Sequence, residues 1–188
     1  MTDPSDATLV GRVRSGDHDA FGVLVDRYQD RMLAYVRYMG FGEAEALDVV
    51  QDSFVRAFRH VGRCGDPDRF DGWLFKIVSN VCRTAGRRRS SRATEPLEAH
   101  RASLVADAPP PDERMETRAI GVLVRAALDR LSPEHREALV LMYLQDHSVA
   151  EIVEMTGASS SAIKMRLMRG REALKAELAP LFQEVGEL

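Results

Sequence analysis

Apolar residues recur at every third or fourth position through most of the chain, a spacing that predicts amphipathic helices. The first half carries three such stretches, at residues 17–39, 43–61 and 71–90. In the second of them, the face expected to be buried comprises Leu47, Val50, Phe54, Ala57, Phe58 and Val61. Gly40 follows the first stretch as an expected helix end, and "GRCGDPDRF" breaks the pattern before the third. We therefore expect a three-helix domain over residues 1–89.

Residues 90–113 differ in composition from the helical stretches. They are mostly small and polar and include three consecutive prolines in "APPPDE". Such a segment favours a flexible or extended linker, because it has too few apolar residues to join a core. Helical spacing returns at Arg114, and Ser132 followed by Pro133 has the pattern of an N-cap and a first helical turn. A second helical domain is expected over residues 114–188, and no segment convincingly predicts a strand.

The stretch "SVAEIVEMTGASSSAIKMRLMRGREALKAEL" predicts two helices joined by a tight turn. Ser148 and Glu151 have the spacing of a capping box, so a short helix should begin there. Gly157 supplies the turn, and Ser159 or Ser160 can cap the next helix. This order of elements is a helix-turn-helix.

The second helix of this motif has two different faces. The face expected to point inward comprises Ile163, Leu167, Gly170 and Leu174. The outward face mixes hydroxyl, flexible apolar and charged side chains, from Ser161, Lys164, Met165, Arg166, Met168, Arg169 and Glu172. Groups of these kinds contact base edges and phosphates in a major groove, which favours duplex DNA as the ligand. The alternative is that these cations only keep an amphipathic helix solvated.

The formal net charge is −3, but cations concentrate in two places. Residues 63–92 hold eight Lys and Arg against three Asp and Glu, a net charge of +5. The eight positions from Lys164 to Arg171 hold four cations and no acid, whereas residues 1–62 have seven cations against ten acids. Two basic patches on an acidic chain favour contact with a polyanion at two points, and they leave acidic surface for another role.

The first basic patch also carries aromatic residues. In "DRFDGWLFKIVSNVCRTAGRRRSSR", Phe70, Trp73 and Phe75 alternate with Arg69, Lys76, Arg83 and the Arg87–Arg89 cluster. Single-stranded nucleic acid suits such a segment, because its exposed bases stack on aromatic rings and its phosphates need cations. Asn80 adds an amide that can bond a base edge. Trp73 and Phe75 are also expected to be at least partly core.

Little else in the sequence predicts chemistry. Cys64 and Cys82 lack metal-ligand spacing, and the five histidines are scattered. No Ser/His/Asp set, HExxH or phosphate-binding glycine motif appears, so we expect no enzyme activity, no cofactor and no metal. The opening "MTDPSDATLV" lacks a signal-peptide pattern, and no apolar run reaches about 18 residues. We expect a cytoplasmic protein without membrane insertion.

Four stretches together resemble the extracytoplasmic-function class of bacterial sigma factors, in that family's order. They are "DVVQDSFVRAFR", "FDGWLFKIVSNVCR", "LDRLSPEHREALVLMYLQDHSVAEIVEMTG" and "SSSAIKMRLMRGREALKAEL". The resemblance implies an all-α fold of two small helical domains, regions 2 and 4, joined by a flexible linker, with the helix-turn-helix in the C-terminal domain. It also implies that the chain directs promoter-specific transcription initiation, without catalysis, by binding core RNA polymerase and recognising −35 and −10 promoter elements.

The resemblance further implies roles for individual residues. Docking on the clamp helices of the polymerase β′ subunit would involve Asp48, Gln51, Asp52 and Arg56. The unwound −10 element, with a base flipped from the stack, would contact Arg63, Phe70, Trp73, Lys76, Asn80 and Arg83. The −35 element would be read as duplex by Ser160, Ser161, Lys164, Met165, Arg166, Met168 and Arg169. The β flap of the polymerase and an anti-sigma factor are further implied partners.

Some residues depart from the family's usual helix-turn-helix. Ala162, Met165 and Gly170 stand where threonine, serine and alanine are common, and Val153 stands where alanine is usual. The residues of the helix-turn-helix therefore do not predict which promoter sequence is recognised. Two other classes also stay open: a stand-alone helix-turn-helix regulator that binds an operator as a dimer, and a protein-binding module whose cationic faces are only solvated. The first leaves residues 17–89 without a role.

Overall fold

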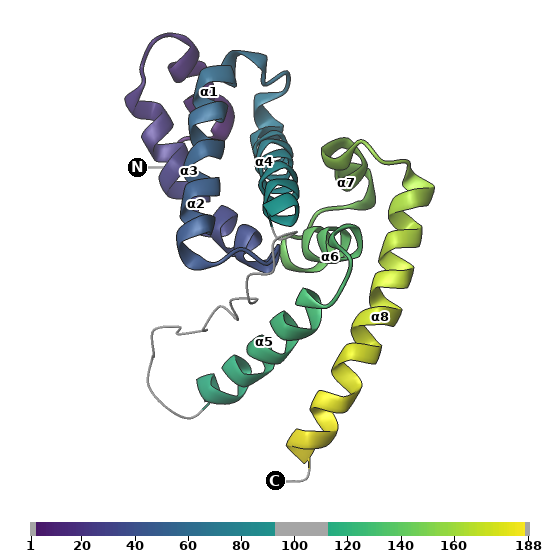
Figure 1. Ribbon diagram of the computed structural model, residues 1–188. Coiled ribbons are helices and arrows are strands. Elements are labelled where there is room, and N and C mark those ends of the chain that lie inside the picture. Colours follow the sequence, from purple (N-terminus) through teal and green to yellow (C-terminus); the bar gives the residue numbers. More distant parts are fainter. Residues whose placement is uncertain (1–2, 93–112, 187–188) are drawn as a thin grey trace.

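The computed structural model describes residues 3–92 and 113–186, which form helices joined by turns, with no strand among them (Figure 1). The first half contains α1 (Asp6–Arg14), α2 (Asp19–Tyr38), α3 (Glu43–His60), the short helices η1 (Val61–Arg63) and η2 (Pro67–Arg69), and α4 (Phe70–Arg92). The second half contains α5 (Glu113–Asp129), α6 (Pro133–Leu139), a π-helical turn η3 (Val140–Leu144), α7 (Val149–Thr156) and α8 (Ser160–Gly186). The expected all-α fold is confirmed.

The first domain has one helix more than the sequence pattern predicted. Ser5 caps α1 by accepting a hydrogen bond from the backbone N–H of Thr8 at 3.3 Å. Leu9, Val10 and Val13 of α1 are buried against the other helices. The expectation of three helices was therefore wrong, because the domain also contains α1. This short helix buries only three side chains, so its sequence shows little of the regular spacing of apolar residues that predicts a helix.

The buried face of α3 is rotated from the one expected. Val50, Phe54 and Ala57 are buried as predicted, but Leu47 is 52% exposed and Phe58 37% exposed. Ala46, Val49 and Ser53 point inward instead. The prediction therefore holds for Val50, Phe54, Ala57 and Val61 and was wrong for Leu47, whereas the partly exposed Phe58 packs edge-on against Phe21 with ring centroids 5.2 Å apart.

The predicted helix ends are mostly found. Gly40 follows α2 with a φ of +85°, in the left-handed region that glycine tolerates. Ser132 caps α6 by accepting a hydrogen bond from the N–H of His135. At the expected linker, α4 continues to Arg92 and α5 begins at Glu113, while residues 93–112 lie outside the described part of the chain.

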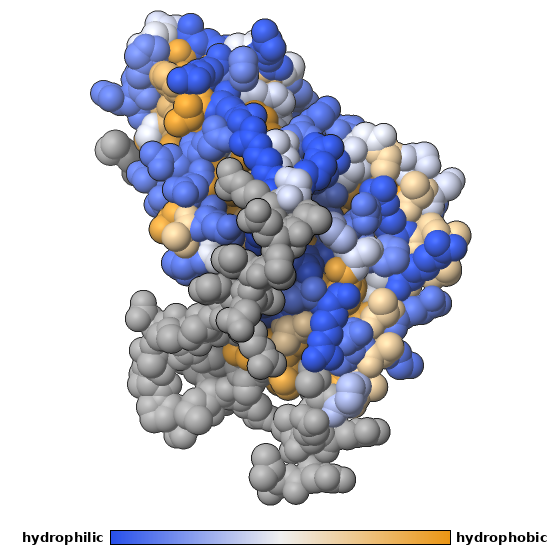
Figure 2. Space-filling model, in the orientation of Figure 1, coloured by the Kyte–Doolittle hydropathy of each residue, from blue (hydrophilic) through white to orange (hydrophobic). Residues whose placement is uncertain are grey.

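The two halves pack directly on each other. In Figure 1, α7 lies beside α4, and α6 lies near the ends of α2 and α4. On the face drawn in Figure 2, hydrophilic residues dominate and hydrophobic ones form small separate areas. No helix within the described residues is both long enough and apolar enough to cross a membrane.

Candidate nucleic-acid interface

The predicted helix-turn-helix is formed by α7, the turn at Gly157 and α8. The N–H of Ser148 donates to Glu151 Oε2 at 2.7 Å, and the N–H of Glu151 donates to Ser148 Oγ at 3.3 Å, which completes the capping box. The Ser148 hydroxyl, which donates to Glu151 Oε2 at 2.6 Å, and then the Ser148 N–H hold the pKa of the Glu151 carboxyl below its ordinary value. Gly157 has a φ of +71°, and Ser159 Oγ accepts from the N–H of Ala162 at 3.2 Å. The short helix and the turn therefore fix where α8 begins.

The inward face of α8 is the one expected. Ile163 is fully buried and Leu167 is 6% exposed. A Cβ on Gly170 would lie 3.2 Å from side-chain carbons of Leu139, tighter than ordinary van der Waals contact. Gly170 therefore lets α8 approach α6 closely. Packing on this side turns the opposite side of α8 toward solvent.

The outward face of α8 carries cations that have no partner among the residues that the structure describes. Lys164 and Arg169 are exposed, and Arg166 is half-buried. None of the three makes an ion pair or hydrogen bond with another side chain in the described part of the chain. By contrast, Arg171 on the same helix donates to Tyr143 Oη at 3.3 Å. Ser160, Ser161, Met165 and Met168 are exposed beside these cations.

A second surface follows α4 and the turn before it. Trp73 and Arg83 are half-buried, Lys76 and Asn80 are exposed, and Arg63 is exposed in η1. Arg83 Nη2 donates to Asn80 Oδ1 at 2.9 Å, so the amide and the guanidinium are held together. The surface therefore offers an indole ring, an amide and cations along one helix.

Phe70 does not belong to that exposed surface. It is 0% exposed, and its ring centroid lies 5.6 Å from that of Tyr28 and 5.7 Å from that of Trp73. The expected direct contact of Phe70 with DNA is corrected to a supporting role beneath Trp73. Phe75 is also fully buried.

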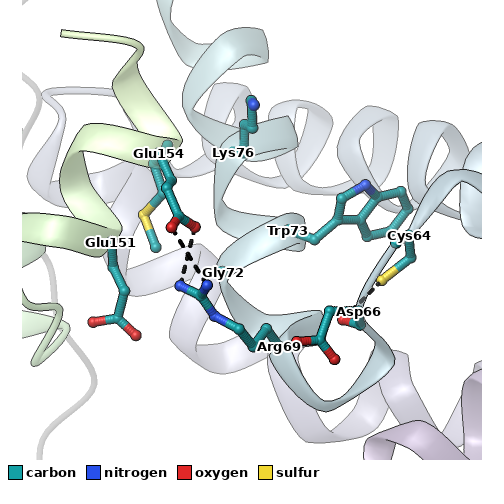
Figure 3. A pocket seen from close by; sticks show the side chains of 10 residues that line it. Cys64, Asp66, Arg69, Gly72, Trp73, Lys76, Glu151 and Glu154 are labelled. Atoms are coloured by element: carbon teal, nitrogen blue, oxygen red, sulfur yellow. Dashed lines mark hydrogen bonds and ion pairs between the residues drawn. The ribbon is translucent and has the colours of Figure 1, made fainter.

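A hollow of about 180 Å³ lies between this surface and α7 (Figure 3). Its lining includes Asp66, Trp73 and Lys76 from one side and Glu151 and Met155 from the other. In Figure 3, Arg69 and Glu154 point toward each other across it, and their closest atoms are 3.0 Å apart. Side chains of α7 therefore close one side of the surface that follows α4.

Arg14 is a residue of this site that the sequence did not indicate. Its guanidinium reaches from α1 to the turn before α4, where Nη2 donates to the carbonyl of Val61 at 3.2 Å and also to that of Cys64. Arg14 therefore fixes the turn that carries Arg63. The sequence carries no local signal for this contact, because the acceptors of Arg14 lie about fifty residues further along the chain.

The exposed face of α3 carries a different set of side chains. Asp48, Gln51, Asp52 and Arg56 are all exposed. Arg56 Nη2 lies 2.9 Å from Asp52 Oδ2, one helical turn away. The face is polar but includes exposed Val55, as a surface that meets another protein commonly does.

The cysteines and histidines form no reactive centre among the residues described. No group of three or more His, Cys, Asp and Glu side chains in this part of the chain could hold a metal. Cys64 and Cys82 are both buried, and burial raises the pKa of Cys82 to about 12. Little thiolate therefore forms at Cys82 near neutral pH.

Comparison with known proteins accounts for both halves of the chain. The family model for sigma-70 region 2 matches residues 24–92, and the one for sigma-70 region 4 matches residues 122–174. The RNA polymerase sigma factor NccH of Alcaligenes xylosoxydans xylosoxydans is 32% identical over 183 residues, which cover 95% of this chain and 97% of that protein. The chain is an extracytoplasmic-function sigma factor.

Other relatives agree with this assignment. The ECF RNA polymerase sigma factor SigW of Bacillus subtilis is 29% identical over 181 residues, 92% of this chain and 96% of that protein. The structure of CnrH in complex with the cytosolic domain of CnrY has a TM-score of 0.68 at 30% identity, over 94% of this chain and 99% of that one. The sigma factor RpoE of Bartonella quintana, in complex with the anti-sigma factor NepR, shares the fold with a TM-score of 0.67 at 22% identity, over 85% and 96% of the two chains.

The family assignment decides between the functional hypotheses that the sequence left open. This sigma factor directs promoter-specific transcription initiation by binding core RNA polymerase and recognising promoter elements. A stand-alone regulator left residues 17–89 without a role, and the match to region 2 supplies one. Sigma factors are initiation factors and not enzymes.

Proposed function

We propose that the two cationic surfaces of this sigma factor divide promoter recognition between them. The outward face of α8 reads the −35 element as duplex, through Lys164, Met165, Arg166, Met168 and Arg169, with Ser160 and Ser161 at the helix start. The surface along α4 captures the unwound −10 strand through Trp73, Lys76, Asn80 and Arg83, with Arg63 on the turn that Arg14 holds. Capture of a flipped base offsets the unstacking cost of a few kcal/mol.

This proposal rests on the observation that cations on both surfaces have no partner among the described residues. Lys164, Arg166 and Arg169 on α8, and Arg63 and Lys76 on the other surface, have no ion pair or hydrogen-bond partner among the described residues. Exposed cations that are left unpaired on two separate surfaces favour binding of phosphates at two points.

The remaining assignments concern protein partners. We assign the exposed face of α3, with Asp48, Gln51, Asp52 and Arg56, to the β′ clamp helices of the polymerase, and region 4 to the β flap. An anti-sigma factor is a further proposed partner, because both solved relatives were determined with a bound protein and NepR is such a factor. We place the action of the chain in the cytoplasm, where polymerase and DNA meet, and propose that it needs no cofactor and catalyses no reaction.

Transcription in vitro tests the proposal. Purified chain and bacterial core polymerase are incubated with fragmented genomic DNA from the source, and transcript 5′ ends are sequenced. We expect start sites that share one −35 motif and one −10 motif and that need the chain. Start sites that do not depend on the chain would contradict the proposal.

A further inference from the structure

Two methionines on the outward face of α8 differ from the other methionines of the chain. Met165 is 44% exposed and Met168 is 42% exposed. Among the methionines whose side chains the structure describes, these two alone are exposed. The others are buried in the core or pack against it, namely Met32, Met39, Met142 and Met155. The exposed thioethers of the described residues therefore share a face with Lys164 and Arg169.

Met165 and Met168 lie close together on this face. Residues three apart are neighbours on a helix surface, so the two side chains form one apolar patch. Lys164 and Arg169 flank the patch, and both are exposed. Neither methionine is among the side chains that form the described core or pack against it. A change in the chemistry of the two sulfur atoms should therefore leave the fold as it is.

The patch suits a duplex that contains thymine. In the major groove each thymine presents a C5-methyl group, which apolar side chains contact. A methionine side chain is flexible and polarisable, so its tip can adjust to the position of such a methyl group. The cations on either side suit the phosphates. The arrangement therefore combines an apolar contact to bases with charges for the DNA backbone.

The cysteines offer an oxidant little reactive thiol. Cys64 and Cys82 are both buried. Burial raises the pKa of both thiols, that of Cys82 to about 12. Oxidants react with the thiolate, and little of it forms at either residue near neutral pH. Among the described residues, the thioethers of Met165 and Met168 are therefore the sulfur atoms that a peroxide reaches most readily.

We propose that Met165 and Met168 are an oxidation site for peroxides, and that their conversion to sulfoxides weakens contact with thymine methyl groups of the −35 element. This inference rests on the proposed −35 role of α8. The sulfur lone pair attacks one peroxide oxygen, so that the S–O bond forms as the O–O bond breaks. The hydroxide that leaves takes up a proton and becomes water. The sulfur loses two electrons, and the peroxide gains them.

A sulfoxide changes the contact with DNA. Its oxygen is a hydrogen-bond acceptor, whereas a thymine methyl group offers no donor, so burying one against the other is unfavourable. Loss of one base contact resembles a mismatched base pair, which weakens binding by about 5- to 150-fold. Methionine sulfoxide reductases restore the thioether, with one enzyme for each sulfoxide epimer. The effect on promoter binding is therefore reversible.

Peroxide treatment of the full chain tests the proposal. The chain is oxidised with hydrogen peroxide, the excess is removed, and core polymerase is added. Peptide mass spectrometry measures sulfoxide at each methionine, and fluorescence anisotropy measures holoenzyme affinity for a promoter identified by the transcript ends. We expect sulfoxide at Met165 and Met168 before Met32 or Met155, and a fall in affinity of about 5- to 150-fold. Reductases for both epimers, with dithiothreitol, should restore the affinity.

Two double variants separate the site from the rest of the chain. Met165→Leu with Met168→Leu removes both exposed sulfur atoms and keeps apolar side chains of similar size. Met39→Leu with Met142→Leu is the matched control, because it removes two half-buried sulfur atoms and leaves the site intact. Each protein is compared with its own untreated sample. The first variant should keep its affinity after peroxide, and the control should lose as much as the wild type.

Deoxyuridine in place of thymine tests the partner of the two side chains. This nucleotide lacks the C5-methyl group, so substitution throughout the −35 element should weaken binding of the untreated wild type. Oxidation should then cause a smaller further loss than on the thymine promoter, because both changes remove the same contact. Losses that simply multiply would mean that Met165 and Met168 do not contact thymine methyl groups, and the inference would be overturned.

Unfolding in urea is measured on the same samples, and an unchanged midpoint after peroxide supports a direct effect on DNA binding. The inference also fails if sulfoxide does not form first at Met165 and Met168, or forms there without loss of affinity. It fails equally if the leucine variant loses as much as the wild type, or if the midpoint falls with the affinity. A scrambled −35 element tests the proposed function separately. If the untreated holoenzyme binds it as tightly as the intact promoter, α8 does not recognise the −35 element.

Discussion

Mutations on the two faces of α8 should have different effects. Those on the inward face should lower the stability of the fold, and those on the outward face should weaken DNA binding. Leu167 is 6% exposed and packs inward, so Leu167→Ala removes three buried carbons, worth about 2.4 kcal/mol at about 0.8 kcal/mol each. The cavity left behind adds to this loss, giving an expected total of about 2–5 kcal/mol. Arg169→Ala removes an exposed, unpaired side chain, so the free energy of unfolding should change by no more than about 0.5 kcal/mol.

For promoter binding we expect the larger direct effects from the outward residues Arg169 and Lys164. Arg169→Ala should cost about 1–3 kcal/mol of promoter binding, and relax preference at one base of the −35 element, if its contact is bidentate to guanine. If Lys164 contacts only phosphate, Lys164→Ala should weaken all sequences alike and reduce the salt slope by about one. Lys175→Ala is the matched control, an exposed cation three turns further along the same helix.

The assay measures holoenzyme affinity for promoters in which each −35 base is varied, across a salt series. Urea unfolding of the same variants gives their stability. If the Lys164/Arg169 double mutant keeps both the affinity and the salt slope of the wild type, α8 does not read DNA with these residues, and its cations only keep the helix solvated.

Three further predictions concern region 2 and its contact with region 4. Replacing Asp48 and Gln51 together by alanine should weaken binding to core polymerase with helicity and thermal stability nearly unchanged; normal affinity would assign the face of α3 another role. Asn80→Ala should reduce open-complex formation on duplex promoter, and a template already mismatched across the −10 element should relieve the defect; equal defects on both would contradict a role in melting. Because the pKa of His147 is lowered from 6.5 in the folded chain, its contribution to stability is present above that value and lost as the pH falls below it. His147→Gln should reduce the loss of stability between pH 7.5 and 5.5 in urea unfolding, and an unchanged loss would mean that other groups cause it.

The helix-turn-helix was predictable because its signals are local. The capping box at Ser148, the left-handed glycine at Gly157 and the spacing of Ile163 and Leu167 each act within one or two turns of helix. Tertiary contacts had little part in deciding these elements. The faces of α8 follow from the same spacing, so its exposed cations could be named from the sequence.

The parts that were missed depend on contacts distant in sequence. The nine residues of α1 are stabilised by packing, and Arg14 reaches acceptors about fifty residues away. Phe70 was expected at the DNA because aromatic residues near cations suit bases, but the same ring fills the core under Tyr28. From the sequence alone, Glu137 would be expected to lie on the exposed face of a helix. It is buried because it contacts Tyr35 and Arg83 of the other domain.

The most direct test of the central claim is formation of open complexes at a promoter identified by the transcript ends. Permanganate reactivity of unpaired thymines at the −10 element is measured with core polymerase alone, with the chain alone, and with both together. Unpaired thymines should appear only with both, and Lys164→Ala and Asn80→Ala should each reduce them. Sequence-specific binding by the chain alone, with no increase in reactivity when polymerase is added, would contradict the account and identify an operator-binding regulator.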